Sequence, residues 1–385
     1  MISSGNVASL ARIGTLTTAG QISDPVMVVD GVAYVNSNYS NTLYAYNVAS
    51  GQLLWTFAGT NLDAPTGVAV RGGTVFVTCA IDSSHAGLCA LKAKTGKLLW
   101  SWAYMGFTSL PDSPPAVSGK VVYFVEYQTY GDWLTALDAK TGTVLWQFGY
   151  CADTGICVAL GQYAPAIDGG QVYVGCSGES GLAVTIQGIC AVNATTGQEI
   201  WATQLGGSGG QWGDGSGRLM ANKGVVYANY ETSTCYSCNY TIDVVALKGT
   251  TGATVWDTPV TLALSNTYGP DGPPAIHGKQ IISVLDCCDA DNDSGLVALA
   301  AKTGQVQWHA ESDNWFASSA SIVNELAFVE CTHLDGSICA FDTTDGSPLW
   351  NSPDSGAEGG ITPIITGGIA YEVCGSNNVC LYAPQ

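Results

Sequence analysis

The chain contains seven gapless copies of an eleven-residue segment, and this repeat constrains the fold more than any other feature. The copy Ala136–Trp146 reads Ala-Leu-Asp-Ala-Lys-Thr-Gly-Thr-Val-Leu-Trp. In every copy a Gly follows the Ala by six positions and a Trp follows it by ten. The other copies are Ala45–Trp55, Ala90–Trp100, Ala191–Trp201, Ala246–Trp256, Ala298–Trp308 and Ala340–Trp350. Repetition at one spacing along most of the chain predicts a repeat architecture.

Each copy has the pattern of a β-hairpin that needs a neighbour. Two apolar runs flank a polar turn, and the turn Gly supplies the positive φ that a short hairpin requires. The Ala marks a place where a large side chain would not fit. The Trp is a large apolar plate that a lone hairpin cannot bury, whereas a stacked neighbour can. The repeat therefore predicts a closed or stacked array of units.

The copies resemble the tryptophan-docking motif of the pyrroloquinoline quinone (PQQ) repeat β-propellers. That superfamily includes quinoprotein alcohol dehydrogenases and BamB-like scaffold proteins, and the resemblance covers nearly the whole chain. It implies a propeller fold. It does not decide between the two functional branches, because the motif is structural in both.

The segments between the copies complete the units. A pair of apolar runs around a short turn precedes each copy, so each unit has four predicted antiparallel strands. An eighth pair, Ile361–Ile365 and Ile369–Val373, follows the last Trp, and Val379–Ala383 adds a third strand. The N-terminal run Leu10–Thr17 supplies the fourth strand, and this closure removes an exposed sheet edge.

We therefore predict an all-β fold: an eight-bladed β-propeller of four-stranded antiparallel blades, closed by the N-terminal strand that completes the last blade. It forms one domain, residues 1–385. The expected blades span residues 24–57, 64–102, 112–148, 162–203, 216–258, 271–310, 316–352, and 360–385 together with 8–18.

Charge and hydropathy exclude several function classes. The formal net charge is −19, from 31 acidic and 12 basic residues, so the chain lacks the basic surface that nucleic-acid binding needs. No apolar run approaches the length of about 18 residues that a membrane span requires. There is no Cys-X-X-Cys-His haem motif, and the four His show no metal-ligand spacing.

The fourteen Cys predict seven disulfides and an oxidising compartment, extracellular or periplasmic. Four Cys follow an apolar strand in one register, and each has a partner on the next strand, which predicts a staple within four blades. The remaining six are expected to pair locally. The expected pairs are Cys79–Cys89, Cys176–Cys190, Cys331–Cys339, Cys374–Cys380, Cys151–Cys157, Cys235–Cys238 and the adjacent Cys287–Cys288.

A recurring acid marks the loops that enter the inner strands. Asp24, Asp112 and Asp271 each lie seven residues before the turn Gly of their blade. In a closed ring such acids would line one mouth of the central channel, where grouped carboxylates favour a cation. Trp212 and Trp315 lie in the same class of loop and predict an aromatic platform for a sugar, quinone or cation. The alternatives are turn and strand capping for the acids and packing under a loop for the Trp.

One further loop predicts a metal site. Asp289, Asp291 and Asp293 alternate ahead of a Gly, a spacing that resembles calcium-binding loops. A solvated acidic turn is the alternative. The vicinal pair Cys287–Cys288 resembles the disulfide that quinoprotein alcohol dehydrogenases place over PQQ, but it occurs later in the chain, and a rigid turn beside the acidic loop is the other interpretation.

Two functions follow from these observations. The first is a secreted, disulfide-stapled, non-catalytic module that binds a protein, a polymer, or a cationic or hydroxyl-rich ligand at the channel mouth, with Ca²⁺ as its candidate ion. The second is an alcohol or sugar dehydrogenase that depends on PQQ and Ca²⁺. PQQ carries three carboxylates, and twelve basic residues, several of them in hairpin turns, fit such an anion poorly. We therefore favour the binding module.

Overall fold

The computed structural model describes most of the chain. The described residues are 1–22, 24–37, 40–59, 67–80, 86–103, 113–128, 131–149, 158–160, 164–180, 184–209, 218–231, 242–260, 272–285, 294–312, 318–331, 338–353 and 361–385.

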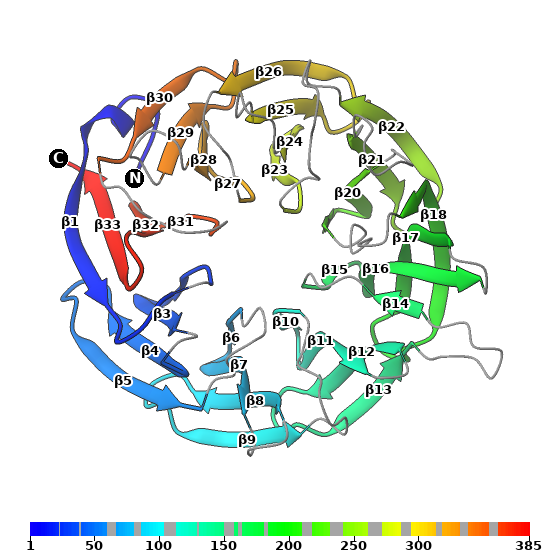
Figure 1. Ribbon diagram of the computed structural model, residues 1–385, viewed down its shortest axis with the longest axis horizontal. Helices are drawn as coiled ribbons and strands as arrows, with labels where there is room; N and C mark the ends of the chain where they lie inside the picture. The colour runs from blue at the N-terminus through cyan, green and yellow to red at the C-terminus, as the bar shows by residue number, and fades with distance from the viewer. Residues whose placement is uncertain are drawn as a thin grey trace.

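Eight antiparallel sheets form a closed ring around a central axis, which confirms the predicted eight-bladed propeller (Figure 1). Seven sheets use four consecutive strands with the first strand innermost, and the fourth of these carries one additional strand. The eighth sheet has the order β1-β33-β32-β31, so it joins the two ends of the chain. Besides these strands there is one short 3-10 helix in the described residues, η1 (Val7–Ser9).

The strands of the first four blades are β2 (Met27–Val29), β3 (Val32–Ser37), β4 (Thr42–Asn47) and β5 (Leu53–Ala58); β6 (Ala69–Arg71), β7 (Thr74–Ala80), β8 (Ala86–Lys92) and β9 (Leu98–Ala103); β10 (Ala116–Ser118), β11 (Val121–Gln128), β12 (Gly131–Asp138) and β13 (Val144–Phe148); β15 (Ala166–Asp168), β16 (Gln171–Ser180), β17 (Val184–Asn193) and β18 (Glu199–Gly209), with the additional β14 (Val158–Leu160).

The strands of the last four blades are β19 (Leu219–Asn222), β20 (Val225–Glu231), β21 (Ile242–Lys248) and β22 (Thr254–Val260); β23 (Ala275–His277), β24 (Gln280–Leu285), β25 (Ser294–Ala300) and β26 (Val306–Ser312); β27 (Ser321–Val323), β28 (Leu326–Glu330), β29 (Ile338–Asp342) and β30 (Pro348–Asn351); β31 (Ile364–Thr366), β32 (Ile369–Val373), β33 (Asn378–Pro384) and β1 (Leu10–Thr17).

In the first six blades the docking Trp lies on the turn of the following blade. Trp100 donates its indole N–H to the carbonyl oxygen of Ala139 at 3.1 Å, and its ring covers Gly142. A methyl group at Gly142 would lie 2.6 Å from Trp100 Cε3, so the turn position that needs φ of +72° also needs the absence of a side chain. Equivalent indole N–H bonds join Trp55 to Ala93, Trp146 to Ala194, Trp201 to Gly249, Trp256 to Ala301 and Trp308 to Thr343.

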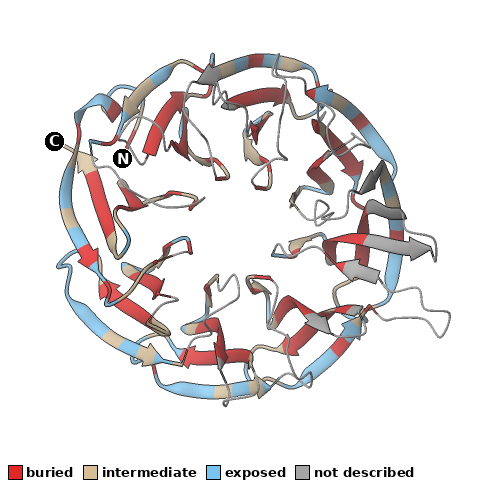
Figure 2. Cartoon of the chain, viewed as in Figure 1, coloured by how far each residue is buried: buried red, intermediate tan, exposed pale blue. Residues whose placement is uncertain are grey.

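The constant spacing within the repeat follows from strand pairing. The Ala pairs across the outer hairpin with the Trp, as Ala136 does with Trp146, and a β-bulge directly after this pair accommodates one extra residue. Ala136 is fully buried between neighbouring blades, where a larger side chain would displace packed groups. The hydrophobic core is divided among the interfaces between blades, with the middle strands buried and the outer strands exposed (Figure 2).

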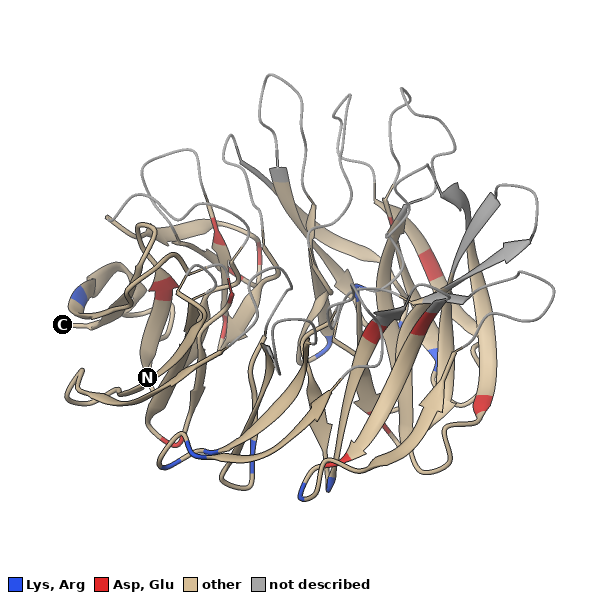
Figure 3. Cartoon of the chain, turned by 60° about the horizontal axis from the view of Figure 1, so that its bottom comes forward, with Lys and Arg blue, Asp and Glu red and all other residues tan. Residues whose placement is uncertain are grey.

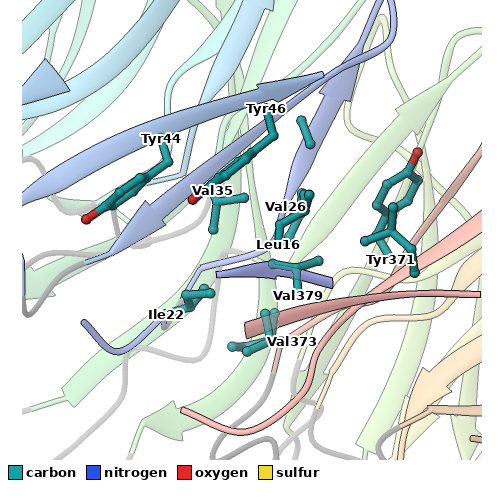
Figure 4. Close-up of a cluster of buried hydrophobic side chains, with 12 residues drawn as sticks. Leu16, Ile22, Val26, Val35, Tyr44, Tyr46, Tyr371, Val373 and Val379 are labelled. Atoms are coloured by element: carbon teal, nitrogen blue, oxygen red, sulfur yellow. The ribbon is translucent and has the colours of Figure 1, made fainter. Parts of the chain in front are cut away.

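The ring closes where the first and last segments of the chain meet. Strand β1 pairs antiparallel with β33, from Leu10 opposite Pro384 to Thr17 opposite Asn378, which confirms the predicted closure. Leu16, Val379 and Tyr46 belong to one buried cluster between the last blade and the first (Figure 4). The Tyr46 hydroxyl donates to the carbonyl oxygen of Thr17 at 2.5 Å, which ties the first blade to the closing strand.

Four of the seven predicted disulfides lie in the described residues, and all four are confirmed as staples within blades. Each joins the second and third strands of its blade, or the residues directly beside them, with a Cα–Cα distance of 5.7 or 5.8 Å. The bonds are Cys79–Cys89, Cys176–Cys190, Cys331–Cys339 and Cys374–Cys380. Cys151, Cys157, Cys235, Cys238, Cys287 and Cys288 lie outside the described residues.

A buried carboxyl connects the third blade to the additional strand of the fourth. Asp132 in β12 is 6% exposed and accepts a hydrogen bond from the backbone N–H of Leu160 in β14 at 2.7 Å. Burial raises the pKa of Asp132 to about 6, although the bond from Leu160 acts in the opposite direction. The folded protein therefore holds a proton on this carboxyl in a pH range where the unfolded chain has released it.

This pKa shift predicts how stability depends on pH. The contribution of Asp132 is fully present below its unfolded pKa of about 4 and is lost as the pH rises through about 6. Asp132→Asn mimics the protonated acid and keeps an acceptor oxygen for Leu160. We expect the variant to match the wild type near pH 4 and to exceed its free energy of unfolding by about 1–2 kcal/mol at pH 7.5 in urea titrations.

The matched control is Asp138→Asn, because the Thr141 hydroxyl and backbone N–H lower the pKa of Asp138. This surface carboxylate stabilises the fold above about pH 4, so the control should fall below the wild type as the pH rises. A lower stability of Asp132→Asn at neutral pH would show that the buried carboxylate is charged and favourable in the folded state.

The contact between Trp and Gly predicts a difference between two turns of equal geometry. Gly51 has φ of +66°, and a methyl group added there would meet nothing within 4 Å, whereas Gly142 lies under Trp100. Gly51→Ala should cost about 1–2 kcal/mol from the left-handed backbone alone. Gly142→Ala adds the displacement of the indole and should cost about 2–5 kcal/mol in thermal or urea unfolding. Equal losses would mean that the indole contact does not restrict this position.

Candidate functional site

The two ends of the ring carry different connections between strands. In the seven blades with a docking motif, the turn between the first and second strands and the turn of the motif lie at the same end, because the four strands alternate in direction. We call this end the turn face and the opposite end the loop face. The eight short innermost strands surround the axis between the two faces (Figure 1).

Among the predicted site residues, Asp24 is the one that the structure describes. Its side chain is 6% exposed, and its Oδ2 accepts a hydrogen bond from Asn36 Nδ2 at 2.9 Å. The carboxylate is therefore engaged in a buried contact with the second strand of its own blade. The other predicted residues, Asp112, Asp271, Trp212, Trp315, Asp289, Asp291 and Asp293, lie outside the described residues.

The register of the acids differs when it is counted from the paired strand residues instead of from the turn Gly. Gly31 is the second residue of its turn, since Val29 pairs with Val32, but Gly119 is the first residue of its turn, since Ser118 pairs with Val121. Counted from the paired residues, the position of Asp24 is held by Ser113 in the third blade. By the same count, from His277 paired with Gln280, it is held by Gly272 in the sixth. Asp112 and Asp271 come one residue earlier.

In two blades a Ser at this shared position caps the second strand. Ser113 Oγ accepts the backbone N–H of Val125 at 2.8 Å, and Ser318 Oγ accepts that of Glu330 at 3.1 Å. These strand residues correspond to Asn36, the partner of Asp24. A short polar side chain at this point satisfies a buried donor as the chain enters the inner strand. Asp24 occupies the same position and accepts its hydrogen bond from the side-chain Nδ2 of Asn36, so a buried contact within its own blade accounts for this carboxylate.

A buried polar residue at one strand position links successive blades, and sequence reasoning missed it. Asn229 is 1% exposed; its Nδ2 donates to the Gly272 carbonyl oxygen at 3.0 Å, and its Oδ1 accepts from Ser283 Oγ at 2.7 Å. Glu330, 2% exposed, accepts the backbone N–H of Ile361 from the eighth blade. In the sequence, this linking residue could have been found as a polar residue two positions after the aromatic residue that pairs with the repeat Ala.

A second polar cluster lies in the fifth blade. The Tyr230 hydroxyl donates to Asp257 Oδ2 at 2.7 Å and lies 3.3 Å from Asp243 Oδ2. Burial raises the pKa of Tyr230, and the two carboxylates raise it further. Burial, followed by the charge of Asp257, also raises the pKa of Asp243. Burial beside a second carboxylate therefore favours the protonated form of Asp243.

The basic residues gather on the turn face, where Figure 3 shows most Lys and Arg at the ends of the blades. Ten of the twelve lie in or beside the turns of this face, and all ten are exposed: Arg71, Lys92, Lys94, Lys97, Lys120, Lys140, Lys223, Lys248, Lys279 and Lys302. Arg12 lies in the closing strand β1, and Arg218 directly precedes β19. Seven acids among the described residues share the turn face, namely Asp30, Asp138, Asp168, Glu199, Glu325, Asp342 and Asp345, so these seventeen residues carry a formal charge of +3.

Metal-ligand groups and membrane-spanning helices are both absent from the described residues. No three His, Cys, Asp or Glu side chains among them lie close enough together to hold a metal ion. The loop that the sequence predicts for Ca²⁺ is not part of these residues. No helix found in the described part of the chain has the length and apolar character of a membrane span.

Comparison with known proteins relates this fold to a family. The family model described as outer membrane protein assembly factor BamB matches residues 39–240 and 241–385. The crystal structure of BamB from Moraxella catarrhalis is similar with a TM-score of 0.65 and 18% identity over 98% of both chains. The quinohemoprotein alcohol dehydrogenase ADHIIG of Pseudomonas putida is similar with a TM-score of 0.69 and 16% identity, over all of this chain and 77% of that one.

A curated relative shows local sequence similarity. It is the 1-butanol dehydrogenase (cytochrome c) of Thauera butanivorans, which is 36% identical over 110 residues. The match covers 25% of this chain and 15% of that enzyme. Because the family model spans nearly the whole chain and the observed ring has the predicted docking contacts, the chain belongs to the BamB-like family of the PQQ-repeat β-propeller superfamily.

Proposed function

We propose that this protein is a non-catalytic binding module that presents a rigid ring of loops in an oxidising compartment, extracellular or periplasmic. Four disulfides within blades support that location and limit the motion of the strands. A preformed surface loses little conformational entropy when it binds a partner. The description of the matching family as an assembly factor also agrees with a function carried out by binding.

The position of the basic residues is the observation that carries this proposal. The quinoprotein alternative requires cationic groups for the three carboxylates of PQQ. Ten of the twelve basic residues lie on the turn face, and Arg12 lies in the outer closing strand. Arg218 is therefore the one basic residue that precedes an inner strand on the side of the loop face. An anionic cofactor at the loop face has too few cationic partners, so the residues present do not fit PQQ there.

The loop face is instead suited to cationic or hydroxyl-rich ligands. Asp112 and Asp271 lie in the loops that lead into β10 and β23, and Trp212 and Trp315 lie in the loops that lead into β19 and β27. We propose that these residues form the binding mouth, with acids that attract a cation and aromatic rings that supply a flat surface. Asp24 is buried and accepts a hydrogen bond from Asn36, so we propose that it supports the fold of its blade and does not contact the ligand.

A cationic probe tests this mouth. The variant Asp112→Asn/Asp271→Asn should weaken binding of a hexalysine peptide about ten-fold or more in isothermal titration calorimetry, because two attractive charges are lost. The wild-type affinity should fall with added salt and below about pH 4, as carboxylates protonate.

The control Asp30→Asn/Glu325→Gln removes two exposed acids from the turn face and should leave the affinity unchanged. Equal weakening by both pairs would indicate attraction to the overall charge and would contradict a localised mouth.

We also propose Ca²⁺ as a structural ion at Asp289, Asp291 and Asp293. Three alternating carboxylates followed by Gly295 supply hard oxygen ligands from one short loop, which is the ligand type that Ca²⁺ prefers. If the loop binds Ca²⁺, EDTA should lower the melting temperature and Asp291→Asn should produce the same loss. A melting temperature that is the same with EDTA and with added Ca²⁺ would leave the loop as an acidic turn.

The dehydrogenase remains the second candidate, and the local similarity to 1-butanol dehydrogenase is the observation that favours it. Reconstitution of the purified protein with PQQ and Ca²⁺, followed by dye reduction with a panel of primary alcohols, separates the two functions. Stoichiometric PQQ binding with turnover would replace the binding module by the enzyme. Turnover without PQQ dependence would contradict both.

A further inference from the structure

Exposed aliphatic side chains form a band along the outer edge of the turn face on the first three blades. They are Leu53 and Leu54 at 46% exposure each, Leu98 at 44%, Leu99 at 51%, Val144 at 46% and Leu145 at 49%. Each pair opens an outer strand directly after the docking turn. Six large aliphatic residues at one edge are more than the scattered exposure that soluble proteins usually show.

The fold does not require apolar residues at these positions. The second residue of each pair is the extra residue of the β-bulge before the Trp, and it has no partner in the ladder of the hairpin. The fourth, fifth and sixth blades place Glu199, Thr254 and Gln307 in these pairs and form the same hairpins. The aliphatic pairs of the first three blades are therefore a property of this part of the ring.

The three pairs are neighbours on one continuous surface. Trp55 of the first blade lies on Gly96 of the second, and Trp100 of the second lies on Gly142 of the third. These contacts place each docking turn beside the outer strand of the preceding blade. The backbone N–H of Lys92 donates to the Lys97 carbonyl oxygen at 2.8 Å, directly before Leu98, so the aliphatic and basic side chains belong to the same hairpins.

The same region has the strongest positive charge of the turn face. The second blade carries Arg71, Lys92, Lys94 and Lys97, all exposed, and its described residues include no acid. The third blade adds exposed Lys120 and Lys140. One acid, Asp138, faces them among the described turn residues of these two blades, and it accepts hydrogen bonds from Thr141. With the exposed Asp30 in the turn of the first blade, six basic residues and two acids give +4 in a chain of −19.

We propose that this basic–aliphatic patch, defined by the six aliphatic and six basic residues named above, docks on the surface of an anionic phospholipid bilayer. Exposed Lys attracts acidic headgroups, and adjacent Leu side chains insert at the boundary between headgroups and acyl chains. A purely polyanionic polymer would make no use of the aliphatic band. At physiological ionic strength charges are screened beyond about 8 Å, so the local patch outweighs the distant net negative charge.

This inference goes beyond the proposed function and gives it an orientation. With the turn face on a bilayer, the acidic loop face points away from the membrane toward soluble partners. Apart from the turn-face residues named above, the chain has 24 acids and two basic residues, and like-charge repulsion from the lipid surface favours this orientation. The docking does not depend on the binding mouth.

Sedimentation with sucrose-loaded vesicles tests the proposal with the intact protein. We expect binding to vesicles of equal parts phosphatidylglycerol and phosphatidylcholine at about 0.15 M salt, none to phosphatidylcholine alone, and loss of binding at about 0.5 M salt. Lys92→Gln/Lys94→Gln/Lys97→Gln should weaken binding roughly 100-fold. The matched control Lys223→Gln/Lys248→Gln/Lys302→Gln makes the same change of charge on other blades and should retain most of the binding.

A second pair of variants tests the aliphatic component. Leu98→Gln/Leu99→Gln should weaken vesicle binding about ten-fold or more, and Ile200→Gln/Val255→Gln on the fourth and fifth blades should not. All four positions are exposed, so circular dichroism should show an unchanged fold. Absence of vesicle binding, or equal loss in both Lys triples, would overturn the proposal. Binding to soluble polyglutamate that is unaffected by the Leu changes would assign the patch to an acidic polymer instead.

Discussion

A docking indole packs on the turn of the next blade, so the local hairpin and the closure of the ring depend on each other. A hairpin alone leaves its Trp in water, and the turn it covers belongs to another blade. The bond from Trp201 to the carbonyl oxygen of Gly249, at 2.7 Å, and the packing of the indole on Gly252 therefore form only when two blades are correctly placed. Stability arises from interfaces between neighbours, as in other repeat proteins.

The junction of the first and last blades shows what replaces this contact where the repeat is interrupted. Gly51 is the turn glycine of the first copy, and no indole covers it because the closing strand β1 carries no Trp. Buried Tyr46 and Leu16 join the two blades instead. The closing blade also has its own disulfide, Cys374–Cys380, so the blade assembled from both ends of the chain is cross-linked within its C-terminal part.

The sequence predicted the blades well and the site less well, for a physical reason. The docking motif is local and gapless, so its geometry follows from spacing alone. The inner turn has two positions and glycine can take either, as Gly31 and Gly119 do with φ of +74° and +60°. Counting from the Gly therefore shifted the acids by one residue. The links made by Asn229 depend on which groups of the next blade face it, and spacing within one blade does not contain that information.

Differences among equivalent positions, rather than the shared pattern, carry the functional information in such a ring. The docking turn of the second blade contains Lys92, Lys94 and Lys97, whereas that of the seventh contains Asp342 and Asp345. Both turns support the same hairpin and accept a Trp from the preceding blade, so the fold is indifferent to their charge. Because folding does not require this charge difference, selection for binding can change it. The basic character of the turns in the second and third blades is therefore what the proposed contact with an anionic bilayer would favour.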